Sequence, residues 1–267
     1  MYTIAVANQK GGCGKTTTAV NLAACLATKG CRVLLVDLDP QAQASTYLRC
    51  EDRNPTGTVF DTMLETRTQR DISELYVPIS RGFNLLPSEG ISCDDEARLN
   101  AQPNRETRLR ETLDGAKDDH EFAVIDCPPT LGVLTRNALM ASNAVLLTIE
   151  TSFLALHGVG KLLNIIQEVR SRHAIRVFAV ATMFDGRTSF SREVLEDMRG
   201  YFDEMMLSTV IRQSVRLRES SSHGEPIFTY ARSSRGADDY RALTDELLGK
   251  IVQGIEEMKQ LVPTLKQ

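Results

Sequence analysis

One short segment near the start of the chain, NQKGGCGKTT at residues 8–17, has the composition of a phosphate-binding loop. Its glycines allow the backbone to curl so that successive N–H groups point at one anion, and a helix starting near Lys15 adds its positive dipole end. Lys15 can then contact the terminal phosphates, while the Thr16 hydroxyl can ligate magnesium. The order of strand, Gly-Lys-Thr and helix favours this chemistry over a merely glycine-rich turn. The residues of this loop expected to contact a nucleotide are Gly11, Gly12, Cys13, Gly14, Lys15, Thr16 and Thr17.

The first half of the loop departs from the common pattern. The sequence G-x-x-x-x-G-K-[ST] has a glycine where this chain has Gln9, and Lys10 follows directly as a second lysine. Because Lys15 already supplies the positive charge at the phosphates, Lys10 needs a separate role.

Acidic residues stand at two further places where a magnesium nucleotide needs them. Asp126 ends the apolar run FAVID, which is the Walker-B placement of a carboxylate that contacts the metal through water. Asp37 and Asp39 lie in VDLDPQ, at the end of another apolar run. Capping of the strand end or of a turn remains an alternative role for Asp37.

Short apolar runs alternate with helical patterns and predict how these residues are positioned. The runs expected to form strands buried on both faces are 2–8, 32–39, 83–88, 122–128, 144–150 and 175–184. The helix candidates are 15–29, 105–115, 131–141, 153–173, 189–205 and 238–259. This alternation predicts an α/β fold, a mostly parallel twisted sheet with helices on both faces. Ligands bind at the carboxyl ends of such strands, so the strand ends expected to form the site are Asn8, Asp37, Asp126 and Ile149.

The bulk composition limits the class of protein. The 267 residues are 42% hydrophobic and 25% charged, as in soluble globular proteins, and no linker or repeat divides them, so 1–267 is expected to be a single domain. The net charge of −4 argues that any anion-binding surface is local. The six cysteines contain no C-x-x-C pair, which argues against a disulfide framework and a zinc site. Without a signal peptide or a run of transmembrane length, the protein is expected to be cytoplasmic.

Four segments in order, KGGCGKTT, VDLDPQAQAS, VIDCPPTLGVLTRNAL and FDGRTSFS, together resemble the ParA/Soj branch of the deviant-Walker ATPases. The similarity runs from the first strand to GEPI near residue 227, so it covers most of the chain. The resemblance implies a ParA-like ATPase domain with a P-loop NTPase-like fold of the deviant Walker A, SIMIBI type. It also implies a Mg²⁺-dependent ATPase that hydrolyses ATP to ADP and phosphate.

The resemblance gives Lys10 a role. In that family the early lysine points across a dimer to the phosphates bound in the partner subunit, so ATP holds the dimer together. The resemblance therefore implies that Lys10, Lys15 and Asp39 are catalytic, with Asp39 positioning the attacking water. It implies that Thr16, Asp39 and Asp126 form the metal site, and that CPPTLG after Asp126 is the switch that senses the γ-phosphate.

A local excess of basic residues is a candidate DNA-binding surface. Between Lys161 and Arg218, ten lysines and arginines face seven acidic residues, although a solvated face would show the same count. In the resemblance, Arg187 and Arg216 match positions that bind the DNA backbone without reading sequence, and Arg218 lies beside them. The implied cycle is an ATP-dependent homodimer that binds non-specific DNA on the nucleoid. A ParB-like partner would stimulate hydrolysis and release it, which segregates or positions a chromosome or plasmid.

Alternatives remain open. A MinD-like ATPase that acts on a membrane or a protein cargo ends in a basic amphipathic helix, whereas this tail carries many acids and Pro263, so we expect a packing helix and no membrane partner. A metabolic ligase would need a substrate site that we do not find. Arg212 and Ser220-Ser221 depart from the family pattern, which leaves the adenine contacts unassigned.

Three cysteines invite chemistry of their own. Cys13 at a helix N-terminus is a candidate redox switch, although a small side chain tolerated there is the preferred interpretation. Cys93 and Cys127 suggest comparison with the nitrogenase iron protein, but their surroundings in the sequence do not match, and we expect no cluster.

Overall fold

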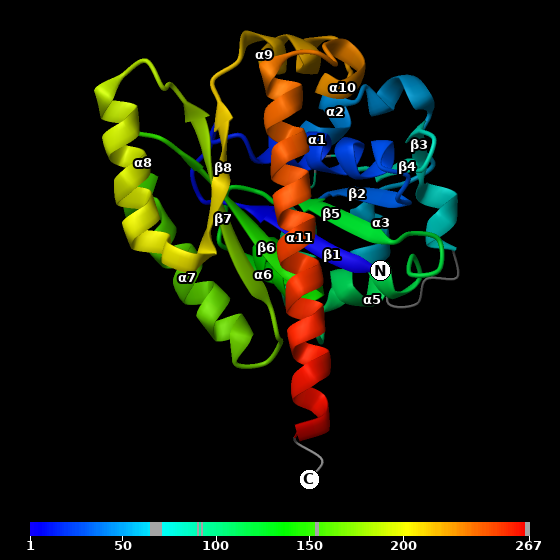
Figure 1. Cartoon of the computed structure of the whole chain (residues 1–267). Coiled ribbons are helices and arrows are strands. Elements are labelled where there is room, and N and C mark those ends of the chain that lie inside the picture. The colour runs from blue at the N-terminus through cyan, green and yellow to red at the C-terminus, as the bar shows by residue number, and fades with distance from the viewer. Residues whose placement is uncertain (65–70, 90, 92, 153–154, 265–267) are drawn as a thin grey trace.

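The computed structural model describes residues 1–64, 71–89, 91, 93–152 and 155–264. Its centre is one eight-stranded sheet with the strand order β3-β4-β2-β5-β1-β6-β7-β8 (Figure 1). The strands are β1 (Tyr2–Ala7), β2 (Val33–Asp37), β3 (Val77–Ser80), β4 (Phe83–Leu86), β5 (Phe122–Asp126), β6 (Ala144–Glu150), β7 (Arg176–Phe184) and β8 (Met206–Arg212).

All pairs of neighbouring strands in this sheet are parallel except β3 with β4, which confirms the mostly parallel sheet expected from the sequence. The central strands form because they are runs of aliphatic residues, and every residue of β2 is buried. β1 lies between β5 and β6, so the chain crosses to one side of β1 first and to the other side later. Such a reversal leaves a crevice at the carboxyl end of the strand, where ligands bind in α/β folds.

Helices cover both faces of the sheet. The α-helices are α1 (Lys15–Thr28), α2 (Gln43–Tyr47), α3 (Val59–Leu64), α4 (Cys93–Ala101), α5 (Arg108–Asp114), α6 (Val133–Ala141), α7 (Ala155–Arg170), α8 (Ser189–Phe202), α9 (Val215–Ser222), α10 (Ile227–Tyr230) and α11 (Arg235–Thr264). The 3₁₀ turns are η1 (Cys50–Arg53), η2 (Ile72–Leu75) and η3 (Asp203–Met205).

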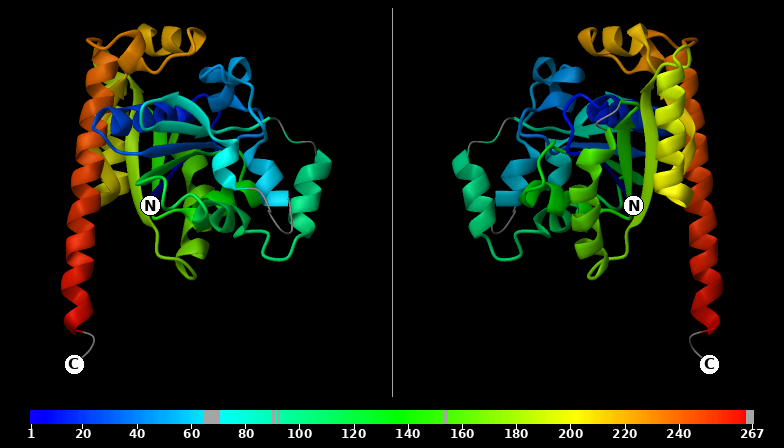
Figure 2. Two further views of the ribbon diagram at one scale, coloured as in Figure 1. Left: turned by 90° about the vertical axis from the view of Figure 1, so that its right-hand side faces the viewer. Right: turned by 90° about the vertical axis from the view of Figure 1, so that its left-hand side faces the viewer.

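Two hydrophobic cores hold these layers to the sheet. Alternation along β1 separates them, because Ile4 and Val6 belong to one core and Ala5 and Ala7 to the other. The first core packs α1, α2 and α9 to α11 against the sheet, and the second packs α3 to α8. Figure 2 shows α11 along one side of the sheet and extending beyond it.

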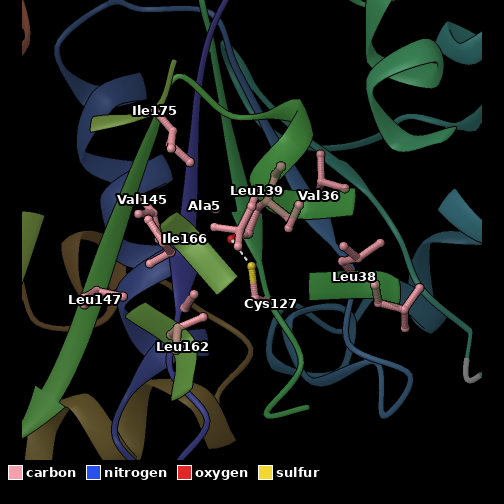
Figure 3. Packing of buried hydrophobic residues seen from close by; sticks show 14 of the residues in the cluster. Ala5, Val36, Leu38, Cys127, Leu139, Val145, Leu147, Leu162, Ile166 and Ile175 are labelled. Carbon is pink, nitrogen blue, oxygen red and sulfur yellow. Dashed lines mark hydrogen bonds between the residues drawn. The ribbon is translucent and has the colours of Figure 1, made fainter. Parts of the chain in front are cut away.

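Cys127 belongs to the second core. Its thiol lies among apolar side chains, with Leu139 of α6 beside it and Ala5 of β1 nearby (Figure 3). Burial raises the pKa of this thiol. The structure therefore gives Cys127 a packing role. Cys93 is the first residue of α4.

The predicted strands and helices are all present within the described residues, apart from residues 153 and 154, which lie outside them. The sequence did not predict β3, β8 or the short helices α2, α3, α4, α9 and α10. β8 is an edge strand of which only two residues are buried, so it lacks a continuous apolar run. The last helix ends at Thr264, five residues later than the expected end at 259. It includes Pro263, and only Thr264 follows the proline within the helix.

Candidate functional site

The loop after β1 is anchored to neighbouring strands at the carboxyl edge of the sheet. Asn8 is buried, and its Nδ2 donates to the carbonyl oxygen of Thr148 in β6 at 2.7 Å. The hydroxyl of Thr182 in β7 donates to the carbonyl oxygen of Cys13 at 2.8 Å. The buried Cys13 thiol donates to the carbonyl oxygen of Lys10 at 3.2 Å. These contacts hold the loop curled over the strand ends, with the cysteine packed inside it.

Two glycines allow this curvature. Gly12 and Gly14 have φ angles of 75° and 86°, in the left-handed region that favours glycine. Gly14 is the N-cap of α1, and no side chain among the described residues caps this helix. The first-turn N–H groups of α1, together with its dipole, are therefore available to an anion.

Lys15 and Thr16 are the first two residues of α1, and their side chains have different partners. The Lys15 side chain turns back across the loop, where its Nζ donates to the carbonyl oxygen of Lys10 at 3.1 Å. Thr16 points toward α2 and donates from its hydroxyl to Gln43 Oε1 at 3.4 Å. The lysine is buried, so its charge is directed at the inside of the loop rather than at solvent. Gln43 is a neighbour of the site that sequence reasoning did not identify.

Two buried carboxylates lie side by side below the loop. Asp37 and Asp126 are register partners on β2 and β5, and neither side chain is exposed. Asp37 accepts hydrogen bonds from the backbone N–H and the hydroxyl of Ser45, at 2.8 and 2.7 Å. Neither carboxylate oxygen of Asp126 has a hydrogen-bond partner within the described part of the chain.

The titration of this pair reflects its burial. Loss of water raises the pKa of Asp126 well above its ordinary value, and the neighbouring Asp37 charge raises it further. Burial also raises the pKa of Asp37 to about 6, although the hydrogen bonds from Ser45 oppose this shift. A buried carboxylate without partners is costly unless a cation compensates it. The donor set at Asp126, with the Thr16 hydroxyl nearby, is the oxygen-rich kind that suits Mg²⁺.

Asp39 sits in the turn that follows β2. It is buried, and its Oδ1 accepts from the backbone N–H of Gln41 at 2.9 Å. The carbonyl oxygen of Asp39 accepts from the Ser88 hydroxyl at 2.9 Å, and the Ser88 N–H donates to Ser45 Oγ at 3.0 Å. Ser45 thus ties the Asp37 carboxylate to the turn that carries Asp39. Asp37 also accepts from the backbone N–H of Asp39 at 3.2 Å, so the structure supports the turn-capping role that the sequence left open for it.

The second lysine of the loop points away from Lys15. Lys10 Nζ forms an ion pair with Glu150, the last residue of β6, and donates to Ser152 Oγ at 3.0 Å. Its side chain is 37% exposed, so the ammonium lies at the surface of its own subunit. The two lysines therefore point in different directions: Lys15 points into the loop, and Lys10 lies at its outer rim.

A cavity of 180 Å³ opens beside the loop at Gly14 and Thr17. The apolar residues of its wall are Met183, Ile211, Leu217 and Tyr240. Its polar residues include Gln213, Ser214, Arg218 and Ser221. An apolar hollow with a few polar groups next to a phosphate loop is suited to the base and sugar of a nucleotide. Arg212 and Ser221, where the sequence departs from the family pattern and leaves the adenine contacts unassigned, both line this cavity. Beyond the loop residues, sequence reasoning did not assign the other wall residues to a nucleotide, because they come from separate segments of the chain.

The three arginines expected to bind DNA fall into two groups. Arg187 is 86% exposed, and it donates to both carboxylate oxygens of Asp185, at 2.8 and 2.7 Å. Arg216 on α9 is also exposed and donates to Glu219 at 2.9 Å. Arg218, which the sequence groups with them, lies instead at the wall of the cavity beside the loop. Two of the three are therefore exposed, and each is already paired with an acidic neighbour.

Comparisons with known proteins agree with this geometry. A family model described as an AAA domain matches residues 1–177. The chromosome partitioning protein ParA of Myxococcus xanthus is 39% identical over 249 residues, which cover 92% of this chain and 87% of that protein. The chain belongs to the ParA/Soj family. The sporulation initiation inhibitor protein Soj of Bacillus subtilis is also 39% identical, over 91% of this chain and 97% of its own.

The structural comparison extends this similarity to three dimensions. Cobyrinic acid a,c-diamide synthase of Mycobacterium smegmatis, solved with a bound ATP analogue and magnesium, has a TM-score of 0.81 and 33% identity. The match covers 95% of this ParA/Soj family member and 97% of the synthase. The family and the fold expected from the sequence are therefore confirmed. None of the described helices is both long enough and apolar enough to cross a bilayer.

Proposed function

We propose that this protein is a partition ATPase that binds Mg²⁺ and ATP, closes into a homodimer, and binds DNA without sequence preference. Hydrolysis, stimulated by a ParB-like partner, then releases the DNA, and repeated cycles segregate or position a chromosome or plasmid. The observation that carries the proposal is the unpartnered, buried Asp126 carboxylate beside a curled loop with Lys15 and Thr16. Names such as ParA and Soj for proteins 39% identical to this chain support the same role.

Each residue of the site has a proposed task in hydrolysis. The glycine-rich loop and the first turn of α1 bind the phosphates, and Lys15 neutralises their charge. Thr16, Asp39 and Asp126 hold the metal ion. Bound magnesium supplies positive charge that stabilises the phosphates as negative charge develops on them. Asp39 orients the attacking water, and its turn is held in place through Ser88 and Asp37.

The cavity beside the loop completes the proposed nucleotide site. Gly14 and Thr17 line it together with Tyr240 of α11, whose hydroxyl is 3.1 Å from the Thr18 hydroxyl of α1. We assign the base and ribose to this cavity, with Arg218 as a contact to the nucleotide rather than to DNA.

Dimer closure gives Lys10 its task. In the closed dimer, Lys10 leaves Glu150 and contacts the phosphates bound by the partner subunit, which neutralises charge there in the way an arginine finger does. The site of one subunit is then incomplete without the other. Slow turnover by the protein alone follows from this dependence, and the stimulating partner accelerates it by organising the closed dimer.

DNA binding is assigned to the surface that carries Arg187 and Arg216. A single subunit offers few phosphate contacts there, and closure places two copies on one rigid body. Binding is therefore expected to need ATP and to weaken steeply with salt, because bound phosphates release counterions. In the ATP form the protein would be associated with the nucleoid.

Two other functions compete with this proposal. A membrane-cycling ATPase would need a free basic amphipathic tail. The middle of α11 packs on β8, where Glu246 accepts from the N–H groups of Ser208 and Thr209. The helix then extends beyond the sheet (Figure 2), but the sequence of this end of the helix carries Glu256 and Glu257 against Lys259 and is not basic. A ligase is the second, because a synthase shares the fold at 33% identity. Amide synthesis would consume ATP in the presence of an acid and an amine donor and would leave DNA unbound.

A binding experiment separates the three functions. Labelled non-specific duplex DNA is incubated with the protein and ATP, ADP or no nucleotide, with and without the product of the neighbouring gene. The partition ATPase binds DNA only with ATP and is released faster with its partner. Equal binding with ADP and ATP, or tight binding to anionic vesicles in place of DNA, would reject the proposal.

A further inference from the structure

One carboxylate on α9 accepts from two donors. Glu219 Oε2 accepts from Arg216 Nη1 at 2.9 Å and from the Tyr230 hydroxyl at 3.0 Å. Tyr230 belongs to α10, and its ring stacks on His223 with the centroids 4.8 Å apart. The tyrosine and the arginine therefore donate to the same oxygen of the carboxylate, and the tyrosine fixes where that oxygen lies.

The inward side of α9 is fixed to the body of the protein. Leu217 and Ser220 are buried, and the Ser220 hydroxyl is hydrogen-bonded to the Tyr47 hydroxyl at 2.7 Å. Arg216 and Glu219 are one helical turn apart on the outward side, where both are partly or fully exposed to solvent. Because the helix is held in place, the carboxylate stays within reach of the arginine.

The carboxylate is also kept charged. Hydrogen bonds from Tyr230 and Arg216 lower the pKa of Glu219, so it remains ionised at neutral pH. An ionised carboxylate offers Arg216 the same kind of oxygen ligands as a phosphate group does. It also places a negative charge where a DNA phosphate would have to approach.

We propose that Glu219 competes with DNA phosphate for Arg216 and so determines how tightly this surface binds DNA. The inference rests on the DNA-binding function proposed above. To bind phosphate, Arg216 must leave Glu219, while Tyr230 keeps the carboxylate in place and ready to take the arginine back. Glu219 thus lowers affinity for DNA and favours release. The pairing of Arg187 with Asp185 repeats the arrangement at the second arginine of the surface.

The competition is expected to be modest in size. Exposed ion pairs contribute little, so each Glu219 should weaken DNA binding only slightly more than about twofold. A closed dimer carries two copies, and their effects combine to roughly fivefold. Such a factor tunes the affinity without abolishing it.

The test uses the full chain and a fluorescein-labelled non-specific duplex, with binding followed by anisotropy in the presence of ATP. Glu219→Gln keeps the side-chain shape but removes its charge, and it should tighten binding by about fivefold. Tyr230→Phe should give a smaller gain, because the carboxylate loses its positioning bond. The matched control is Glu111→Gln, which breaks an Arg–Glu pair of the same spacing on α5, well separated from α9 in Figure 1. This control should leave affinity unchanged.

A double variant, Glu219→Gln with Arg216→Ala, tests whether Glu219 affects DNA binding through Arg216. If Glu219 acts through Arg216, Glu219→Gln will give no gain when Arg216 is already alanine. An equal gain in that background would overturn the inference, because it would show a general charge effect. The inference would also be overturned if the wild type binds DNA and Glu219→Gln binds it with the same affinity. If the wild type forms an ATP dimer yet binds no DNA, both the proposed function and this inference fail.

Discussion

Lys10 forms an ion pair with Glu150, a residue 140 positions away in the sequence, at the carboxyl end of β6. The ammonium is thereby held within its own subunit, at the rim of the loop, and Ser152 accepts a second hydrogen bond from it. This pairing places Lys10 outside the loop interior that Lys15 occupies. Lys10 must therefore break its ion pair with Glu150 before it can contact phosphates in a partner subunit.

Replacement of the outer lysine tests this arrangement. Lys10→Ala should leave nucleotide affinity within about twofold of the wild type, since Lys15 supplies the charge inside the subunit. It should lower the ATP-dependent dimer by at least about tenfold, as expected when a charged hydrogen bond to phosphate is removed. Analytical ultracentrifugation with ATP measures the dimer. Glu150→Gln serves as the control, because it frees Lys10 and should dimerise at least as well as the wild type.

Asp39 is expected to matter most for hydrolysis, because Thr16 and Asp126 remain to hold the metal ion when Asp39 is removed. Asp39→Ala should bind ATP and dimerise, yet lose turnover by roughly 100-fold or more, because the water is no longer oriented. Phosphate release, measured alongside sedimentation, separates the two effects. Gln41→Ala is a suitable neighbour control in the same turn. Wild-type hydrolysis by the Asp39 variant would contradict the assignment.

Asp126 should show opposite effects on stability with and without ligand. Its buried carboxylate accepts no hydrogen bond in the described structure, so Asp126→Asn should stabilise the nucleotide-free protein. A gain of about 2–4 °C in Tm, or roughly 1 kcal/mol, is expected for a chain of this size. The same variant should lose the rise in Tm that Mg²⁺ and ATP produce. Differential scanning fluorimetry measures both, and Asp118→Asn, a change at an exposed site, should alter neither.

The DNA surface is tested by its salt dependence. Arg187→Ala should weaken ATP-dependent DNA binding and flatten the slope of log K against log salt by about one unit for each DNA phosphate that is no longer bound. ATP-driven dimerisation should persist, because the arginine lies outside the phosphate loop. Arg199→Ala, on the following helix and also in an ion pair, is the control. A slope equal to that of the wild type would remove Arg187 from the DNA surface.

His120 should make the fold sensitive to mild acid. The ring is buried beside Tyr76, with Nε2 3.1 Å from Asn84 Nδ2, and burial lowers its pKa. Below a pH of about 6.5 the unfolded chain takes up a proton at this position more readily than the native chain does. The free energy of unfolding should therefore fall as the pH falls.

Substitution isolates this contribution from the other titrating groups. His120→Gln should show a flatter fall in stability between about pH 7.5 and 5.5, measured by urea unfolding, than the wild type. His223→Gln, at an exposed histidine, should keep the wild-type profile. Identical profiles for the wild type and His120→Gln would contradict the expected effect.

The sequence by itself determined the chemistry-bearing loop and the class of fold. A phosphate loop is recognisable because its glycines, Lys15 and Thr16 act through local geometry at fixed spacing. The central strands were recognisable because burial on both faces demands unbroken apolar runs. Asp126 followed from the same logic, since it ends such a run.

Tertiary structure alone decided which distant residues meet. β3 and β8 escaped prediction because edge strands are only half covered and carry polar residues. The cavity beside Gly14 draws its wall from five separate elements, α1, β7, β8, α9 and α11, and no local pattern encodes that meeting. Glu150, 140 positions from its partner Lys10, and Glu219, beside Tyr230 of another helix, acquire their roles only through contacts made by the folded chain. Residue type and spacing set what each segment can do, but strand order and helix packing set what it touches.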